Sequence, residues 1–413
     1  MKILHFADAH IDMANYGRHD PVTGLPLRVL DFLKSLDTII DAAIQEKVDL
    51  VLFAGDAYKD RTPAPTFQRE WGRRIMRLSK AGIPTLLLIG NHDVSPASGR
   101  AFSFQEFDTL EVPHVKIISR PGILTPETLE GLPVQVIALP WISRSTVAAA
   151  MQNREETEKD ANRSLEEISI ELVGRWMADL DPNLPTILLA HASIEGAKYG
   201  GERSVMLGGD FTLPPSLVKD KRLDYVAMGH IHKKQDVNEC SHPPVIYPGS
   251  IERVDFGEAG DEKFYVVADI HKGNSQVDFR QLTGIRPFIT CEVKVDDDRP
   301  ITEQLISALP SKEKLTGAIV RLIAKYPREK QAQIDEKALR DHASNAFEFH
   351  FVPRPEMDVR VRLAENQAIA SLSPKDLAEI YWKGLHLAPA EIPTLLDLVD
   401  QIVTESDSEE GVI

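Results

Sequence analysis

Five short segments of this 413-residue chain carry carboxylate, amide and imidazole side chains in patterns that suit metal binding. They are Asp8-Ala9-His10, Gly55-Asp56, Gly90-Asn91-His92-Asp93, His191 and Gly229-His230-Ile231-His232. Carboxylate oxygens and neutral imidazole nitrogens together favour borderline divalent ions such as Mn²⁺, Fe²⁺ or Zn²⁺, and the lack of cysteine among them disfavours a structural zinc site. In DxH and HxH, side chains two residues apart can point to the same side of an extended segment. We therefore expect a metal centre.

Each segment alone is a weak indication, because a single histidine after a buried strand is more often a hydrogen-bonded core residue than a ligand. Their order along the chain is more informative, since an apolar run precedes each one. The runs cover residues 2–7, 49–54, 85–89, 186–190 and 225–228. We read these runs as buried strands, and glycines before Asp56, Asn91 and His230 should permit the turns that follow.

Helical spacing of apolar residues predicts two crossover helices among the first hundred residues, over 27–44 and 65–81. This region therefore has a βαβαβ pattern, and open α/β sheets bind ligands at the carboxyl ends of their strands. Further strands are predicted over 134–139, 245–247, 264–270 and 277–282, the last three continuing the sheet as a meander, and a charged helix over 154–180.

The segment Gly284-Ile285-Arg286-Pro287 is the predicted domain boundary. Alternating strand and helix patterns over 288–355 indicate a small α+β domain. Ser373-Pro374 is a good helix start, and two helices are predicted over 374–385 and 392–403. We expect the acidic end, residues 405–410, to be disordered.

The motifs, taken in order, resemble those of the calcineurin-like metallophosphoesterase superfamily: DxH, GDxxxD, GNHD, a single histidine and GHxH. The resemblance covers residues 1–283. It implies an α/β protein with a four-layer α/β/β/α sandwich, in which helices flank two sheets and a cleft holds two metal ions.

The same resemblance implies a role for each residue. One ion would be held by Asp8, His10, Asp56 and His232, and the other by Asp56, Asn91, His191 and His230, with Asp56 as the bridge. Two such ions lower the pKa of a water and clamp phosphate oxygens for in-line attack at phosphorus. His92 would be the acid or transition-state stabiliser at the leaving alkoxide. Two readings of Asp93 stay open, orienting His92 or capping a following helix.

Longer segments resemble the SbcD-type nuclease subunits of double-strand-break repair complexes. These segments are KILHFADAHID, GDAYKDRTPAP, the block Tyr247 to Glu258, and Arg286-Pro287-Phe288. The resemblance implies a Mn²⁺-dependent DNA phosphodiesterase in repair and recombination, an exonuclease on duplex ends and an endonuclease on single strands. It also implies three parts: a nuclease domain over 1–283, a capping and DNA-binding domain over 288–355, and a helical tail over 370–405. That tail would bind an SbcC-type, SMC-like ATPase, and the chain could form a homodimer through its first helices.

Basic residues near the expected site are candidates for DNA contact. They are Arg18, Lys59, Arg61, Arg69, Arg73 and Arg77. The last three form a stripe along the helix predicted over 65–81, and each charge that neutralises a phosphate would steepen the salt dependence of binding. The alternative is an ordinary solvated helix face.

The overall charge argues against a nucleic-acid partner at first sight. Lys and Arg number 47 against 63 Asp and Glu, a formal net charge of −16. However, two of the acidic residues, Asp8 and Asp56, are expected metal ligands, and two divalent ions would offset about four negative charges. Other acidic residues lie in the tail. We therefore expect weak, salt-sensitive DNA binding that depends on metal and a partner.

Two rival functions remain. One is a calcineurin-like phosphoesterase for small or lipid-linked phosphoesters, and the other is a non-catalytic scaffold, which the full ligand set disfavours. No apolar run approaches the roughly 18 to 20 residues of a membrane span, and no secretory signal begins the chain, so we expect a cytoplasmic protein without membrane contact.

Overall fold

The computed structural model describes residues 1–94, 101–141, 165–200, 211–295, 299–356, 372–384 and 392–409. The chain divides into two compact units. Unit 1 comprises Met1–Thr290, Glu313–Val320 and Asn345–Phe349, and unit 2 comprises Cys291–Lys312, Arg321–Ser344 and His350–Ile413. All seven expected metal ligands lie in unit 1.

The first sheet of unit 1 has six strands in the order β14-β13-β1-β2-β3-β4. They are β14 (Gln276–Gln281), β13 (Phe264–Asp269), β1 (Lys2–Phe6), β2 (Leu50–Phe53), β3 (Thr85–Leu88) and β4 (Val115–Ile118). The last four run parallel, because helices α1 (Leu27–Gln45) and α2 (Pro65–Lys80) provide the crossovers between β1, β2 and β3.

The second sheet has the order β11-β12-β10-β7-β6-β5. Its strands are β11 (Gln235–Asp236), β12 (Val245–Tyr247), β10 (Tyr225–Gly229), β7 (Thr186–His191), β6 (Gln135–Leu139) and β5 (Gly122–Leu124). Strands β12, β10, β7 and β6 are parallel, so β7 and β10 deliver His191 and His230 to the same edge.

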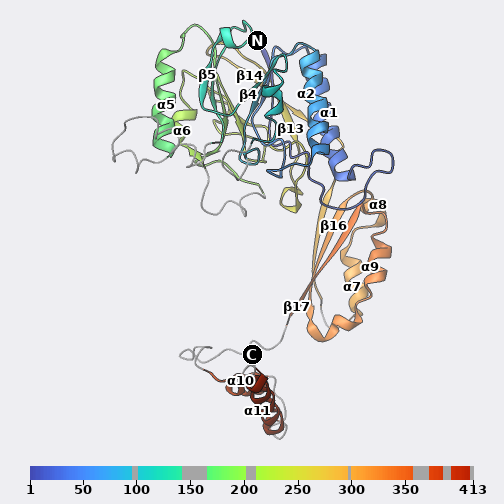
Figure 1. Ribbon diagram of the computed structural model, residues 1–413. Helices are drawn as coiled ribbons and strands as arrows, with labels where there is room; N and C mark the ends of the chain where they lie inside the picture. Colours follow the sequence, from blue (N-terminus) through green and yellow to red (C-terminus); the bar gives the residue numbers. More distant parts are fainter. Residues whose placement is uncertain are drawn as a thin grey trace. The chain divides into compact units, whose positions relative to one another are not determined.

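Alternating side chains on the strands build the layers of unit 1. Leu50 and Leu52 pack into an apolar cluster shared with the second sheet, whereas Val51 and Phe53 pack against α1 and α2. The outer face of the second sheet packs against α5 (Leu165–Asp179) and α6 (Pro215–Val218). Figure 1 shows the two helix pairs on opposite sides of the sheets. The predicted four-layer sandwich is confirmed.

Shorter elements complete unit 1. They are α3 (Glu106–Thr109), η1 (Pro126–Thr128), the paired strands β8 (Ser193–Ile194) and β9 (Thr212–Leu213), and η4 (Phe256–Glu258).

The chain beyond residue 287 forms a three-stranded sheet with the order β15-β16-β17. Its strands are β15 (Phe288–Lys294), β16 (Ile319–Pro327) and β17 (Glu348–Glu356), and its helices are α7 (Ile301–Ala308), α8 (Lys312–Leu315), η5 (Arg328–Gln333) and α9 (Glu336–His342). Helices α10 (Pro374–Gly384) and α11 (Ile392–Glu409) follow and contact each other.

Several sequence expectations differ from the structure. The expected meander is wrong: β12 joins the second sheet, whereas β13 pairs antiparallel with β1 in the first, because a local pattern predicts a strand but not its partner. The acidic end is not disordered as far as Glu409, because α11 reaches that residue. No glycine or proline lies between residues 394 and 410 to stop the helix earlier. Residue 410 and residues 154–164 of the predicted charged helix lie outside the described residues. No helix in the described part is both long and apolar enough to cross a bilayer.

Candidate metal centre

Loops after β1, β2, β7 and β10 meet at one edge of the two sheets. Backbone hydrogen bonds join the first two loops, from Asp8 N to Gly55 O at 3.0 Å and from Ala9 N to Asp56 O at 2.8 Å. The backbone φ is 50° at Asp8, 40° at His10, 64° at Asp56 and 95° at His230, a region that L-residues adopt at a cost. Such strain concentrates at functional sites.

Two of the glycines that precede ligands are required by close packing. A Cβ on Gly229 would lie 2.0 Å from the Ala54 carbonyl oxygen, and one on Gly90 would lie 2.1 Å from Asp56 Oδ1. Only Gly55 has a positive φ, of 98°. Gly90 does open the expected turn, since Asp93 N donates to its carbonyl oxygen at 3.3 Å. At Gly90 and Gly229, however, the lack of a side chain serves the close approach of neighbouring loops rather than a positive φ.

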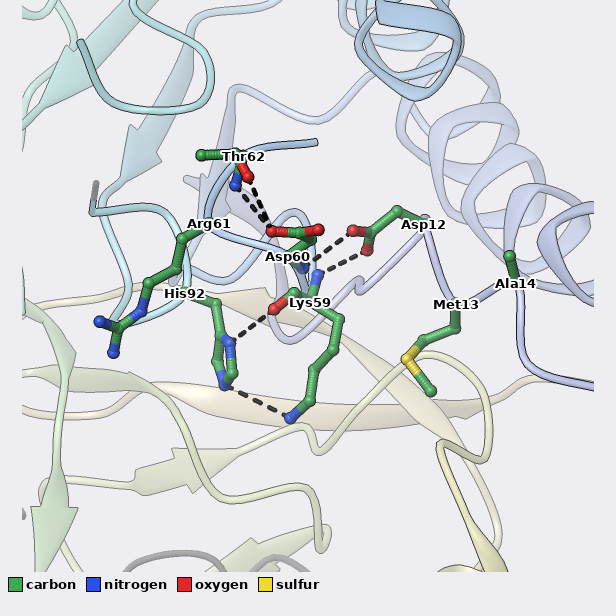
Figure 2. A pocket seen from close by; sticks show the side chains of 8 residues that line it. All are labelled: Asp12, Met13, Ala14, Lys59, Asp60, Arg61, Thr62 and His92. Carbon is green, nitrogen blue, oxygen red and sulfur yellow. Dashed lines mark hydrogen bonds between the residues drawn. The ribbon is translucent and has the colours of Figure 1, made fainter. Parts of the chain in front are cut away.

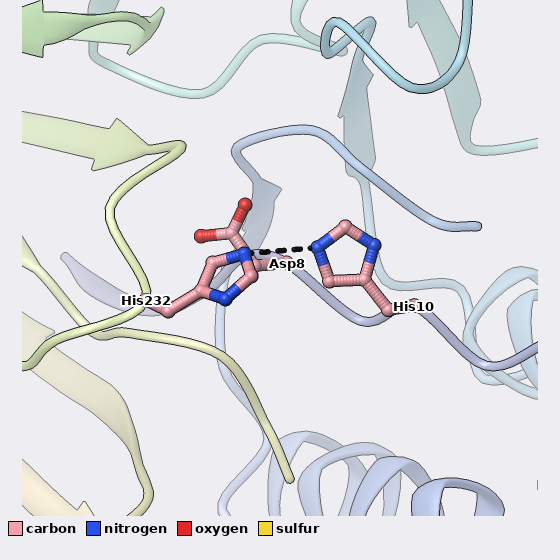
Figure 3. A group of neighbouring side chains, drawn as sticks. All are labelled: Asp8, His10 and His232. Atoms are coloured by element: carbon pink, nitrogen blue, oxygen red, sulfur yellow. Dashed lines mark hydrogen bonds between the residues drawn. The ribbon is translucent and has the colours of Figure 1, made fainter. Parts of the chain in front are cut away.

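Asp8, His10 and His232 form one cluster whose ligand atoms lie within 4.8 Å of one another. His10 Nε2 and His232 Nε2 are 3.0 Å apart, as Figure 3 shows. His10 Nδ1 faces the Tyr58 carbonyl oxygen at 3.2 Å, and His232 Nδ1 faces Glu258 Oε1 at 2.7 Å. Each Nδ1 faces an acceptor and so carries the ring proton, which leaves two Nε2 lone pairs pointing at each other. This arrangement fits a cation between them.

The neutral state of His10 agrees with this geometry. Burial, and then the neighbouring His232, hold the pKa of His10 well below its usual value. The ring is therefore available as a lone-pair donor.

Asp8, Asp56 and His191 form the second cluster. His191 Nδ1 faces the Ala54 carbonyl oxygen at 2.6 Å, so its Nε2 lone pair points at Asn91 Oδ1, 2.9 Å away, and at Asp56 Oδ2, 3.4 Å away. His230 Nδ1 is 3.0 Å from the same Asn91 oxygen. Oxygen and nitrogen atoms with free electron pairs converge here, and such atoms are the ligands of a divalent cation.

The second cluster attracts positive charge. Burial by itself lowers the pKa of His191, but the carboxylates of Asp56 and Asp8 outweigh burial and raise that pKa to about 9. Without a cation, a proton on Nε2 therefore supplies the positive charge, and a bound cation would take its place. The two clusters thus fit a pair of cations. Asp8 belongs to both, whereas the sequence resemblance implied Asp56 as the bridge.

Asp93 binds backbone donors of two neighbouring loops rather than the His92 ring. Residues 95–100, where a helix capped by Asp93 would begin, lie outside the described residues. Its Oδ2 accepts hydrogen bonds from Asp56 N and Gly90 N, both at 2.8 Å, and its Oδ1 accepts one from Ala57 N at 3.0 Å. It is fully buried. The carboxylate therefore ties the loop after β2 to the loop after β3, because these backbone donors meet at its position.

His92 lies at the wall of a pocket of about 600 Å³ beside the metal clusters. Its Nδ1 faces the Lys59 carbonyl oxygen at 2.8 Å, and its Nε2 is 3.3 Å from Lys59 Nζ. Burial lowers the pKa of His92. The ring is thus held from both sides by one residue (Figure 2).

The pocket is lined by charged side chains of both signs. Asp12 accepts hydrogen bonds from the backbone N of Lys59 and of Asp60, and Asp60 accepts from Thr62 N. The loop thus fixes both carboxylates, and Lys59 and Arg61 bring two positive charges to the same pocket beside the neutral His92 ring.

The predicted basic stripe on α2 is paired with carboxylates. Arg69 and Arg73 form ion pairs with Glu70, and Arg77 forms ion pairs with Asp37 and Asp41 of α1. Within the stripe, Arg77 links α2 to α1, whereas Arg69 and Arg73 pair within α2. Arg18 is exposed on the loop before α1.

Sequence reasoning missed two residues behind His232, Glu258 and Lys263. Lys263 Nζ lies 2.6 Å from Glu258 Oε2, and both side chains are buried. Glu258 is the last residue of the block Tyr247 to Glu258 that resembles SbcD-type subunits. The sequence pattern indicates ligands directly after strands, and such a pattern cannot show which carboxylate hydrogen-bonds to the Nδ1 of a ligand histidine.

Comparisons with known proteins place this centre in a family. The chain is 27% identical over 346 residues to the SbcD subunit of nuclease SbcCD from Rhodobacter capsulatus, covering 79% of this chain and 81% of that protein. It is 28% identical over 312 residues to the SbcD subunit of nuclease SbcCD from Staphylococcus epidermidis, with 74% and 75% covered. It is also 27% identical over 290 residues to the uncharacterized metallophosphoesterase YhaO of Bacillus subtilis, with 68% of this chain covered and 59% of YhaO. The family model of calcineurin-like phosphoesterases matches residues 1–234, more than half of the chain. This chain belongs to the calcineurin-like phosphoesterase family.

Proposed function

We propose that this protein is a Mn²⁺-dependent DNA phosphodiesterase that acts as an exonuclease on duplex ends and an endonuclease on single strands in double-strand-break repair and recombination. The observation that carries the proposal is the convergence of two acceptor clusters beside a pocket lined by Lys59, Arg61 and His92. The two SbcD relatives support DNA as the substrate.

The proposed ligands are those implied by the sequence: Asp8, His10, Asp56 and His232 for one ion, and Asp56, Asn91, His191 and His230 for the other. Bound divalent ions would supply an acidified water and would neutralise charge on the phosphate. Mn²⁺ suits this mixture of carboxylate, amide and imidazole donors.

The protein's own residues act on the substrate side. The Lys59 carbonyl oxygen fixes the His92 ring with its proton on Nδ1, so Nε2 points toward the Lys59 ammonium in the pocket. A phosphate there would attract the ammonium, and its negative charge would favour a second proton on His92, at Nε2, which could then pass to the leaving oxygen. Lys59 and Arg61 are our leading candidates for contact with the DNA backbone. Arg18, Arg69 and Arg73 are secondary candidates, and Arg77 is weaker because two carboxylates pair with it.

A nuclease assay tests this proposal. Purified protein with Mn²⁺ is given end-labelled blunt duplex, single-stranded circles, and a chromogenic phosphomonoester. We expect cleavage of both DNAs, and a reduction in kcat of about 10²- to 10⁴-fold for His92→Ala with Mn²⁺ binding retained.

His114→Ala is the matched control, because His114 faces Glu130 at 2.7 Å outside the site and should leave kcat unchanged. Efficient phosphomonoester hydrolysis with intact DNA would favour the small-substrate alternative. Full activity in His92→Ala would remove the role proposed for that residue.

The proposed partners are an SbcC-type ATPase, bound through α10 and α11, and a second copy of this chain. Tyr381, Leu398 and Ile402 expose large apolar side chains on these two helices, which supports a docking role. The proposed parts of the chain remain the nuclease domain, the capping domain and the partner-binding tail, with the boundaries given above.

A further inference from the structure

A buried ionic cluster, formed by Glu258, Lys263 and Ser250, lies directly behind His232. Lys263 Nζ donates to Glu258 Oε2 at 2.6 Å and to Ser250 Oγ at 2.7 Å. Glu258 Oε2 also accepts from Val254 N at 3.0 Å. The side chains of Glu258 and Lys263 are only 2% and 1% exposed. Because a buried ion pair by itself adds little stability, the position of this one beside a ligand ring is informative.

The ionic cluster lies behind only one of the histidines His10, His191 and His232, so the two candidate cation sites differ in the hydrogen-bond partners of their histidines. Nδ1 of His10 and Nδ1 of His191 face backbone carbonyl oxygens, whereas Nδ1 of His232 faces a carboxylate. A carboxylate behind an imidazole fixes the ring and its tautomer more firmly than a neutral carbonyl, and it strengthens the far nitrogen as a ligand. This partner belongs to the cluster Asp8, His10 and His232.

Lys263 has a distinct part in this arrangement. With Ser250 and Val254 N, it occupies Glu258 Oε2, which leaves Oε1 for the His232 ring. It also balances the charge of a carboxylate that is removed from water. Glu258 is thereby held in one orientation.

We propose that Glu258, held by Lys263, is a positioning residue that makes the cluster Asp8, His10 and His232 the tighter of the two divalent-cation sites and the first to fill. This inference rests on the proposed function, because it assumes that both clusters bind metal. It concerns the order and strength of binding.

Calorimetric titration of metal-stripped, full-length protein with Mn²⁺ tests the inference. We expect two steps for the unaltered protein. Glu258→Gln should weaken the first step by about 10- to 100-fold and leave the second unchanged within about twofold. His191→Ala should remove the second step and keep the first, which identifies the clusters.

Glu252→Gln is the matched control. Glu252 is as buried as Glu258 and lies six residues before it in the chain, but its carboxylate is 3.8 Å from the Arg28 guanidinium rather than against His232. Both Mn²⁺ steps should be unchanged in this variant.

The double variant Glu258→Gln/Lys263→Met removes both buried charges together, so it guards against misfolding from a single unpaired charge. Circular dichroism confirms the fold, and the first Mn²⁺ step should again be weakened. The inference would be overturned if the folded double variant kept the Mn²⁺ affinity of the unaltered protein in the first step, or if the affinities of both steps fell equally. Unaltered protein that binds two Mn²⁺ but leaves DNA intact would count against the proposed function alone.

Discussion

At the residue scale, the site depends on side chains that hold the ligand loops as much as on the ligands. Asp93 is the plainest case, since its two oxygens receive backbone N–H donors from the loops after β2 and β3. His92, its chain neighbour, is instead held by Lys59. The adjacent residues His92 and Asp93 therefore have different roles: His92 lines the pocket, and Asp93 holds two loops together.

Asp93→Asn tests this division. The amide offers only one acceptor oxygen, so at least one buried backbone donor loses its partner, and we expect a loss of about 2 to 4 kcal/mol in the free energy of unfolding. Urea denaturation measures the loss, and Asp108→Asn, on the exposed surface of α3, is the control. If Asp93→Asn keeps its stability but loses kcat as His92→Ala does, Asp93 acts through His92 instead.

At the element scale, the loops approach one another more closely than ordinary residues permit. Strand β10 ends at Gly229, whose Cα faces the Ala54 carbonyl oxygen after β2. Two strands from different sheets are thus brought together by the lack of a side chain.

Gly229→Ala should force the loops apart, lowering the melting temperature and weakening Mn²⁺ binding by at least about tenfold. The matched control is Gly72→Ala in α2, where a Cβ meets its nearest neighbour, Phe107 Cζ, at 4.0 Å. That change should instead stabilise the helix by about 0.5 to 1 kcal/mol. Calorimetric melting compares the two, and unchanged Mn²⁺ binding in Gly229→Ala would contradict the packing argument.

The tail helices permit a second test at this scale. Leu398→Asp/Ile402→Asp replaces two exposed apolar side chains of α11, and we expect at least about a tenfold loss of affinity for an SbcC-type ATPase. Affinity is measured by surface plasmon resonance. Leu110→Asp is the control, since Leu110 is also exposed but lies in unit 1. Equal binding by both variants would exclude α11 as the docking element.

At the scale of the whole molecule, the two sheets enclose a histidine that must stay neutral. His5 of β1 points between the sheets, where its Nδ1 lies 3.0 Å from the Tyr225 hydroxyl of β10. Burial lowers the pKa of His5 from 6.5 to about 3. The unfolded chain therefore binds a proton at His5 between these values, and the folded chain does not.

Stability should consequently fall as pH falls from 6.5 toward 3, because a proton bound only by the unfolded state favours unfolding. At pH 5 the loss from His5 is about 2 kcal/mol, at 1.36 kcal/mol per pH unit. Urea unfolding of His5→Gln and the unaltered protein, in chelator and over pH 4 to 8, measures the difference. If the free energy of unfolding changed with pH in the same way in both proteins, His5 would not be the cause of the pH dependence.

Metal should also stabilise the whole of unit 1, since ligands from both sheets converge on the two clusters. At 100 times the Kd, a cation that binds only the folded state adds about 2.7 kcal/mol. Melting with Mn²⁺ or chelator measures this gain, and Asp56→Ala should lose most of it. If Mn²⁺ raised the melting temperature of Asp56→Ala as much as that of the unaltered protein, the ion would bind elsewhere.

The sequence by itself determined the ligand types, their place after parallel strands and the helices that connect those strands, because these features depend on local periodicity and short motifs. For example, the four-residue spacing of Trp71 and Ile75 predicts the buried face of α2. Only the tertiary structure decided that Asp93 ties two loops, that α2 arginines pair with α1, and that Glu258 and Lys263 lie behind His232. These contacts join residues with no sequence pattern in common, and packing of distant segments alone brings them together.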